Sequence, residues 1–281
     1  MKTTDQQAVR TLVRARMDFQ AMRKAMGNRL GKKADGTNQD LIESRSFEAD
    51  DIANFELIQD SAHAQEKQVE KMLKKALKRF PVYNEFLLNV KGVGEIAAGW
   101  IIGEFDIHEA TTVSKMWQYA GLNPGMVRGK KRIDPGKHNG EPIAREIKGR
   151  TGKVEALIIT TDEMIRGDKA TAGFVLPYNK PLRTALVGVM ADGFIKAQSP
   201  YCLEFYYPYK MRLEQSHNEV THIGKEKAWK DVTKGHRDRA AKRYMVKMFI
   251  ADLYAAWRGL EGLPVRKPYQ EEYLGHTHMG Q

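Results

Sequence analysis

Cysteine is almost absent from this sequence of 281 residues, because Cys202 is the only one. A single cysteine excludes an internal disulfide and any zinc site that needs several thiolates. Long apolar runs are also missing: no stretch of about 18 apolar residues occurs, so no segment is expected to span a bilayer. The opening residues Met1–Gln7 lack the apolar core of a secretory signal. We therefore expect a cytoplasmic protein with no membrane partner, no metal and no cofactor.

Positive charge, in contrast, is in excess. Lysine and arginine number 46 against 35 acidic residues, which gives a formal net charge of +11 and a pI of about 9.5. An excess of this size favours a polyanionic partner, and nucleic acid and an anionic membrane surface are the usual ones. The composition therefore indicates a function in binding rather than a particular fold.

Two segments near the N-terminus, residues 8–30 and 48–80, repeat apolar residues at helical spacing. The first also has basic residues on its other faces, a pattern that fits a solvated helix and an RNA-contacting helix equally well. These basic residues are Arg10, Arg14, Arg16, Arg23, Lys24 and Arg29. Residues 1–81 are thus predicted to form a helical hairpin or coiled coil. Its long apolar stripe, Phe55–Leu77, favours a homodimer.

Residues 82–265 are expected to form a helical nucleic-acid-binding domain, and residues 266–281 a tail. Helices are predicted over residues 181–198 and from Arg237 to Arg258, and a short strand over Val154–Thr161. The strand belongs to an insertion that begins with a glycine-rich, basic segment. The predicted fold class is therefore mainly α, with a long N-terminal helical hairpin and a short strand-containing insertion.

The segment Leu87–Ile101 has the form of a helix-hairpin-helix. One helix is expected to end before Gly92, and a second to begin near Glu95. Glycine suits the turn because the turn needs a positive φ and a close backbone approach. The amides at the start of the second helix would then bind phosphate without reading sequence. Lys91, Gly92 and Gly94 are therefore candidate nucleic-acid-binding residues, although a glycine-capped helix connection explains the same pattern.

Two further basic groups are candidates for phosphate contact. They are Arg128, Lys130, Lys131, Arg132 and Lys137 in the glycine-rich segment, and Arg239, Lys242, Arg243 and Lys247 in the last helix. In the second group Arg239, Arg243 and Lys247 recur every four residues and share a helix face. The aromatic cluster at 201–209 fits base stacking or, more often, a corner of the core.

The run Lys91–Pro124, with its Gly-Val-Gly and Ala-Gly-Leu-Asn-Pro motifs, resembles the C-terminal domain of the bridge-RNA-guided insertion-sequence transposases. The segment Asn179–Leu186 is similar to that family's Gly-Asn-x-x-Leu-Arg-x-x-Leu motif. The resemblance covers roughly residues 50–265. It implies nucleic-acid contacts for the polar residues in these motifs, which are Asn123, Asn179, Lys180 and Arg183.

Two departures from that family concern catalysis. Residues 1–50 are too few for the family's nuclease-like domain with its four acidic residues, and no serine occurs between Ser114 and Ser199, where the family has its nucleophile. Asp162 and Glu163 follow the predicted strand, but no matched carboxylate supports a two-metal site. No catalytic residue is therefore predicted.

The hairpin region also resembles the Nop domain of box C/D ribonucleoproteins and, most closely, the stand-alone Tas proteins of tandem interspaced guide RNA (TIGR-Tas) systems. That resemblance implies a homodimer that holds a short guide RNA and recognises target DNA through guide pairing, in a prokaryotic cell or a phage-infected host. Recruitment of a nuclease in trans stays open. Two alternatives remain, an active RNA-guided transposase or recombinase and a sequence-independent DNA-binding protein.

Overall fold

The computed structural model describes residues 3–30, 48–222 and 225–266. Within these ranges the chain is mainly helical, which confirms the predicted fold class. The chain divides into two compact units, Met1–Glu85 with Gly94–Asp106 and Phe86–Val93 with Ile107–Gln281. Residues 94–106 thus belong to the N-terminal unit, not to the domain expected over residues 82–265. Of the expected tail, only residue 266 is described.

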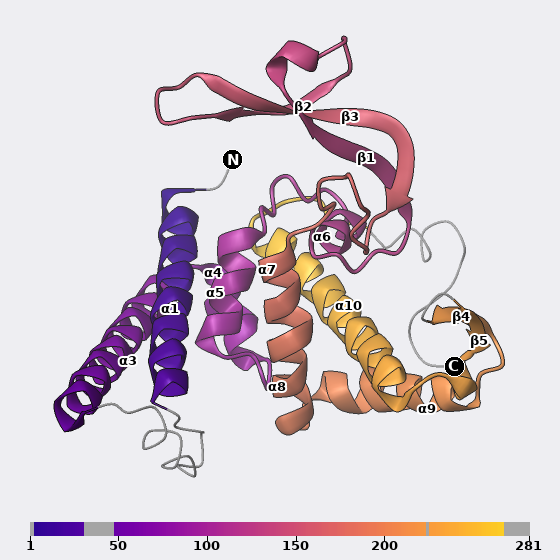
Figure 1. The fold of residues 1–281 in the computed structure, drawn as a ribbon. Helices are drawn as coiled ribbons and strands as arrows, with labels where there is room; N and C mark the ends of the chain where they lie inside the picture. The colour runs from indigo at the N-terminus through magenta and orange to yellow at the C-terminus, as the bar shows by residue number, and fades with distance from the viewer. Residues whose placement is uncertain (1–2, 31–47, 223–224, 267–281) are drawn as a thin grey trace. The chain divides into compact units, whose positions relative to one another are not determined.

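The N-terminal unit contains two long helices, α1 (Thr4–Arg29) and α3 (Ala49–Leu77), which lie side by side (Figure 1). The Thr3 hydroxyl accepts a hydrogen bond from the Gln6 amide N–H at 3.2 Å and so caps α1. Ion pairs join Asp5 to Arg79 and Arg16 to Glu70, so that partners late in one helix face partners early in the other. The two helices are therefore antiparallel, as expected for a helical hairpin.

Four arginines of α1 are bound by two buried glutamates, one on α3 and one at the end of α5 (Glu95–Glu104). The N–O distances are 2.9 Å for Arg10–Glu104, 3.0 Å for Arg14–Glu104, 2.7 Å for Arg16–Glu66 and 2.7 Å for Arg23–Glu66. Two guanidinium groups on each carboxylate offset the cost of burying its charge. These arginines therefore stabilise the N-terminal unit through ion pairs. Neither interpretation of this helix from the sequence, a solvated helix or an RNA-contacting helix, included that role.

Helix α5 packs closely on both long helices because it contains glycine at the contact. A Cβ atom built on Gly99 would lie 2.4 Å from Val13 Cγ2 and 3.2 Å from both δ-carbons of Leu73. Leu73 is fully buried in this contact, whereas Leu57 is 70% exposed. The C-terminal part of the apolar stripe expected at a dimer interface is thus covered within the unit, and part of its N-terminal half is not.

The glycine hairpin differs from its expected form. It is preceded by the short helix α4 (Pro81–Glu85) and a 3₁₀ turn at Leu87–Asn89, and α5 begins at Glu95 as predicted. Gly92 has the expected positive φ, +94°. Gly94 has an extended backbone, φ −90° and ψ 173°, and open space around its Cβ position. Only the first of the two glycines is therefore required by the turn.

The C-terminal unit has a helical core built on α10 (Lys234–Leu260), which buries Met245, Phe249, Leu253 and Trp257. The other helices of this unit are α6 (Val113–Tyr119), α7 (Lys180–Arg183), α8 (Ala191–Lys196) and α9 (Tyr207–Gln215), with π-helical turns at Thr184–Met190 and Cys202–Tyr206. The helices predicted over residues 181–198 and Arg237–Arg258 are confirmed, and both extend slightly at their N-terminal ends. Helix α9 was not expected from the sequence.

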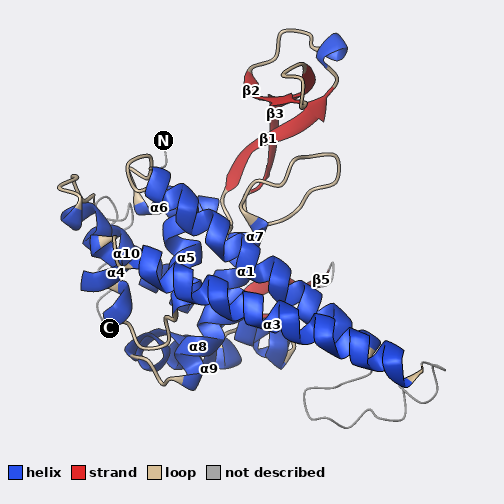
Figure 2. Ribbon diagram, turned by 90° about the vertical axis from the view of Figure 1, so that its left-hand side faces the viewer, coloured by secondary structure: helices blue, strands red, loops and turns tan. Residues whose placement is uncertain are grey.

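Strands β1 (Met126–Ile133), β2 (Ile143–Lys148) and β3 (Val154–Arg166) form an antiparallel sheet in the order β1-β3-β2. Figure 2 shows this sheet projecting from the helices of the same unit. The strand predicted from Val154 is present and runs five residues further than expected. Strands β4 (Glu219–His222) and β5 (Lys225–Ala228) form a second, two-stranded sheet. Two 3₁₀ turns, Pro135–Lys137 and Trp229–Asp231, complete the unit.

Candidate nucleic-acid interface

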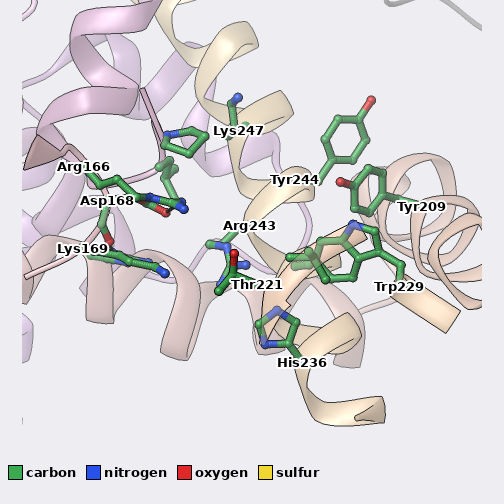
Figure 3. A pocket seen from close by; sticks show the side chains of 15 residues that line it. Arg166, Asp168, Lys169, Tyr209, Thr221, Trp229, His236, Arg243, Tyr244 and Lys247 are labelled. Atoms are coloured by element: carbon green, nitrogen blue, oxygen red, sulfur yellow. Dashed lines mark hydrogen bonds and ion pairs between the residues drawn. The ribbon is translucent and has the colours of Figure 1, made fainter. Parts of the chain in front are cut away.

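A cavity of about 380 Å³ lies in the C-terminal unit beside the first half of α10 (Figure 3). The rest of its wall is formed by residues at the end of β3 and just after it, by residues of α7 and α9, and by residues in or beside β4 and β5. The lining residues are Leu122, Pro124, Arg166, Asp168, Lys169, Arg183, Tyr209, Val220, Thr221, Trp229, His236, Ala240, Arg243, Tyr244 and Lys247. We call this site the basic–aromatic cavity.

Five lining residues are cationic and only one is acidic: Arg166, Lys169, Arg183, Arg243 and Lys247 against Asp168. Arg166 binds both oxygens of that carboxylate, with Nε 2.9 Å from Oδ1 and Nη2 3.0 Å from Oδ2. Such bidentate pairs are among the stronger hydrogen-bonded contacts in proteins. Arg183 donates to the backbone carbonyl of Asp168 at 2.6 Å and finds no carboxylate there. Within the part of the chain that the structure describes, the other four cations of the cavity thus make no ion pair with a carboxylate.

Arg243 and Lys247 lie one helical turn apart on α10, and both are half-buried. Among the residues that the structure describes, neither side chain has a hydrogen-bond or ion-pair partner. The Lys247 ammonium lies 4.4 Å from the centre of the Trp117 ring. Burial lowers the pKa of both groups; the nearby Arg183 lowers that of Arg243 further, and the nearby Asp168 carboxylate raises it only in part. The folded protein thus disfavours both charges, and a bound anion would offset that penalty.

Aromatic rings form the wall opposite Arg166 and Lys169, with Arg243 between the two groups (Figure 3). Tyr209 and Tyr244 are stacked, with ring centres 4.3 Å apart and planes 17° from parallel. Trp229 lies against His236, with ring centres 5.4 Å apart. Aromatic side chains in a cationic recess are the arrangement by which proteins hold unpaired bases beside their phosphates.

The expected basic row on the last helix is only partly brought into the cavity. Arg243 and Lys247 line it, whereas Arg239 is exposed and does not. Lys242 is used differently: its ammonium lies 2.7 Å from Asp192 and 3.0 Å from Asp238. The assignment of Lys242 to phosphate binding is therefore not supported, because two carboxylates already compensate its charge.

The basic segment expected as a glycine-rich loop is strand β1, so its side chains alternate between two faces. Lys131 lies on the face opposite its neighbours, paired with Glu163 and 4.6 Å from the centre of the Phe174 ring. Arg128, Lys130 and Arg132 are exposed, and Lys137 is exposed on the following turn. Lys130, Lys131 and Arg132 therefore do not form one contact surface.

The exposed face of β1 continues onto β2. Arg132 and Arg145 both pair with Ile158 of β3, so their side chains emerge on one face of the sheet. A second cavity, of about 590 Å³, lies beside this face and includes Arg128, Lys130 and Arg145 in its wall. The sheet thus presents a second cationic surface. Its cations are exposed to solvent, whereas Arg243 and Lys247 of the basic–aromatic cavity are half-buried.

The polar residues assigned through the transposase motifs have mainly structural contacts. Asn123 Oδ1 accepts from the Gly125 amide at 3.1 Å within a turn. Asn179 caps α7, since its Oδ1 accepts from the Leu182 amide at 3.1 Å. Lys180 is exposed beside this cap. Of this group only Arg183 lines the basic–aromatic cavity.

The amides of the glycine hairpin are a poorer phosphate site than expected. The Glu95 carboxylate hydrogen-bonds its own backbone amide in the first turn of α5 and also accepts from Lys74 at 2.9 Å. An acidic group thus already occupies the positive end of the helix. Gly92 lies against the backbone of Gly193, which covers one side of the turn. Lys91 is exposed next to it.

Sequence reasoning missed most of the aromatic wall and two of the cations. Tyr209 belongs to the predicted aromatic cluster. Two other members of that cluster have structural contacts: Tyr206 is buried and hydrogen-bonds Asp238, and Tyr201 is half-buried and hydrogen-bonds Asp252. Arg166 is the last residue of β3, Lys169 follows shortly after it, and Trp229 lies beside a short strand. None of these segments contains a motif, so no signal in the sequence marked them.

Over residues 3–30, 48–222 and 225–266, no group of three or more His, Cys, Asp or Glu side chains could hold a metal ion. Asp162 is exposed, and its neighbour Glu163 pairs with Lys131. In the same described ranges no helix combines the length and apolar character that crossing a bilayer requires. Comparison of the chain with known proteins finds neither a matching family model nor a matching curated protein.

Proposed function

We propose that the chain binds single-stranded RNA and holds a short guide RNA for recognition of DNA, without cleaving either. The proposal rests on one observation, the half-buried and uncompensated pair Arg243 and Lys247 in a cavity with an aromatic wall. A negatively charged ligand with flat rings satisfies both features. Nucleic acid is the common biological ligand of this kind.

The recessed shape favours a single strand over a duplex. Paired bases are stacked inside a duplex, whereas unpaired bases can turn out onto aromatic side chains such as Trp229 and Tyr244. The guide role is an inference from the resemblance of the hairpin region to stand-alone Tas proteins. It includes a homodimer, DNA recognition by guide pairing and action in a prokaryotic or phage-infected cytoplasm.

One observation favours a second candidate, sequence-independent binding of duplex DNA. Arg128, Lys130 and Arg132 are exposed along one strand, and Arg145 joins them from the next. An exposed basic surface of this kind can follow a phosphate backbone without reading bases. RNA binding is preferred because this surface lacks the desolvated cations of the cavity.

Sequencing of nucleic acid extracted from the purified protein tests the proposal. Three proteins are compared: wild type, the double variant Arg243→Gln with Lys247→Gln, and the control Lys196→Gln with Lys234→Gln. The control removes the same charge from exposed positions outside the cavity. We expect a discrete short RNA with wild type and control, reduced at least tenfold in the cavity variant.

Two outcomes would contradict the proposal. Recovery of only heterogeneous cellular fragments would argue against a guide RNA. Equal binding of duplex DNA of any sequence by all three proteins, with no RNA retained, would favour the second candidate. Circular dichroism of each variant establishes that a loss of RNA is not a loss of fold.

A further inference from the structure

The charge around the basic–aromatic cavity exceeds what one internal nucleotide of an RNA chain supplies. Among the described residues Lys169, Arg183, Arg243 and Lys247 make no ion pair with a carboxylate. Asp168 also acts on Arg243, but its two oxygens are already bound by Arg166. A phosphodiester has a single negative charge, whereas a phosphomonoester has a charge of roughly −1.5 to −2 at neutral pH. A terminal phosphate therefore compensates the cavity better than a linking one.

The size of the cavity leads to the same conclusion. Its volume of about 380 Å³ lies near the lower end of the range of about 300–1,000 Å³ for small-ligand pockets. A cavity of this volume has room for one nucleotide. An internal nucleotide would need two exits for the strand, whereas a terminal nucleotide needs only one.

The groups also lie in the order that a nucleotide requires. Arg243 stands between the cations that follow β3 and the rings of Tyr209, Tyr244 and Trp229 (Figure 3). A phosphate held at Arg243 thus has an aromatic wall within reach of its own base. Stacking on such a wall is tolerant of base identity, because every base has a flat face.

We infer that the basic–aromatic cavity binds one end of an RNA, with its terminal phosphomonoester at Arg243, Lys247 and Arg183 and its unpaired base against Trp229 and Tyr244. This inference rests on the proposed RNA-binding function and specifies which part of the RNA the cavity holds. A free mononucleotide has the same chemistry, so the test separates the two sources.

Fluorescence anisotropy at one fixed salt concentration provides the measurement. Three short RNAs of one sequence have an internal fluorophore and differ only at their ends: hydroxyl at both, phosphate at the 5′ end, or phosphate at the 3′ end. We expect one of the phosphorylated RNAs to bind wild-type protein about tenfold more tightly than the RNA with two hydroxyl ends. Arg243→Gln should remove this preference, and Arg239→Gln, exposed on the same helix, should retain it.

Each alternative result has a defined meaning. Equal affinity for all three RNAs would overturn the inference and leave RNA binding intact, whereas no binding to any of them would overturn the proposed function as well. Preference for a phosphorylated end that persists in Arg243→Gln would place the end elsewhere. Free 5′-AMP that binds as tightly as the phosphorylated RNA would assign the cavity to a nucleotide, against the inference. If 5′-AMP competes only weakly with the phosphorylated RNA and adenosine does not compete with it, the inference is supported.

Discussion

Gly92 and Gly193 lie backbone against backbone within the C-terminal unit. A Cβ atom on Gly92 would lie 2.8 Å from the Gly193 carbonyl oxygen, and a Cβ on Gly193 would lie 2.7 Å from that of Gly92. These distances are too short for any side chain. Close packing against Gly193 therefore requires glycine at position 92. No such close contact is found at the neighbouring Gly94.

The two glycines of the hairpin should respond very differently to the same substitution. Gly92→Ser combines a positive φ with the contact to Gly193, so we expect the free energy of unfolding to fall by about 2 to 4 kcal/mol. Gly94→Ser, at the N-cap of α5, should change it by less than about 0.5 kcal/mol or stabilise slightly. Urea denaturation measures both. If Gly94→Ser lowers the free energy of unfolding by more than this, both glycines are required, as expected from the sequence.

Removal of the Arg243 charge should stabilise the protein when no ligand is bound. The guanidinium is half-buried, and repulsion from Arg183 adds to the cost of burial, whereas attraction to Asp168 offsets only part of it. Arg243→Gln should therefore raise the free energy of unfolding by roughly 1 kcal/mol. Arg239→Gln, exposed one turn earlier, should have little effect. The comparison requires nucleic-acid-free protein. Destabilisation by Arg243→Gln would instead indicate a structural role for this side chain.

Asp238 should contribute to stability only above acidic pH. Burial alone would raise its pKa, but hydrogen bonds from Tyr206 and Lys242 outweigh burial and lower it from the usual 3.8. A lowered pKa in the folded state means that this stability is present at neutral pH and is lost as the pH falls below 3.8. Lys242→Met should cost about 1 to 2 kcal/mol at pH 7. The difference in free energy of unfolding between wild type and Lys242→Met, measured by denaturation at a series of pH values, should decrease as the pH falls. A difference that does not change with pH would refute this prediction.

The buried and exposed parts of the α3 stripe separate folding from dimerisation. Leu73→Glu places a carboxylate in the contact with α5 and should cost about 3 to 5 kcal/mol, whatever the oligomeric state. Leu57→Glu, at a residue 70% exposed, should leave stability unchanged. If a dimer forms through this surface, sedimentation velocity should detect dissociation with Leu57→Glu. A stable variant that keeps its dimer would place the interface elsewhere.

The sequence alone determined the long helices. Apolar residues at helical spacing are a local signal, so α1, α3 and the buried face of α10 from Met245 to Trp257 follow from periodicity. Strands β1 and β2 did not follow, because half of their residues are charged, most are exposed, and they lack an apolar alternation. Their pairing with β3 joins residues such as Lys131 and Ile159, and no local pattern reports such a contact.

The candidate site was determined only in part by the sequence. The four-residue spacing of Arg243 and Lys247 places both on one helix face, which is a property of local geometry. Adjacent residues in that helix nevertheless differ in their contacts: Lys242 forms ion pairs with Asp192 and Asp238, whereas Arg243 forms no ion pair with any carboxylate that the structure describes. Only the tertiary structure decided this difference, because compensation of a charge depends on carboxylates and burial supplied by segments distant in the chain.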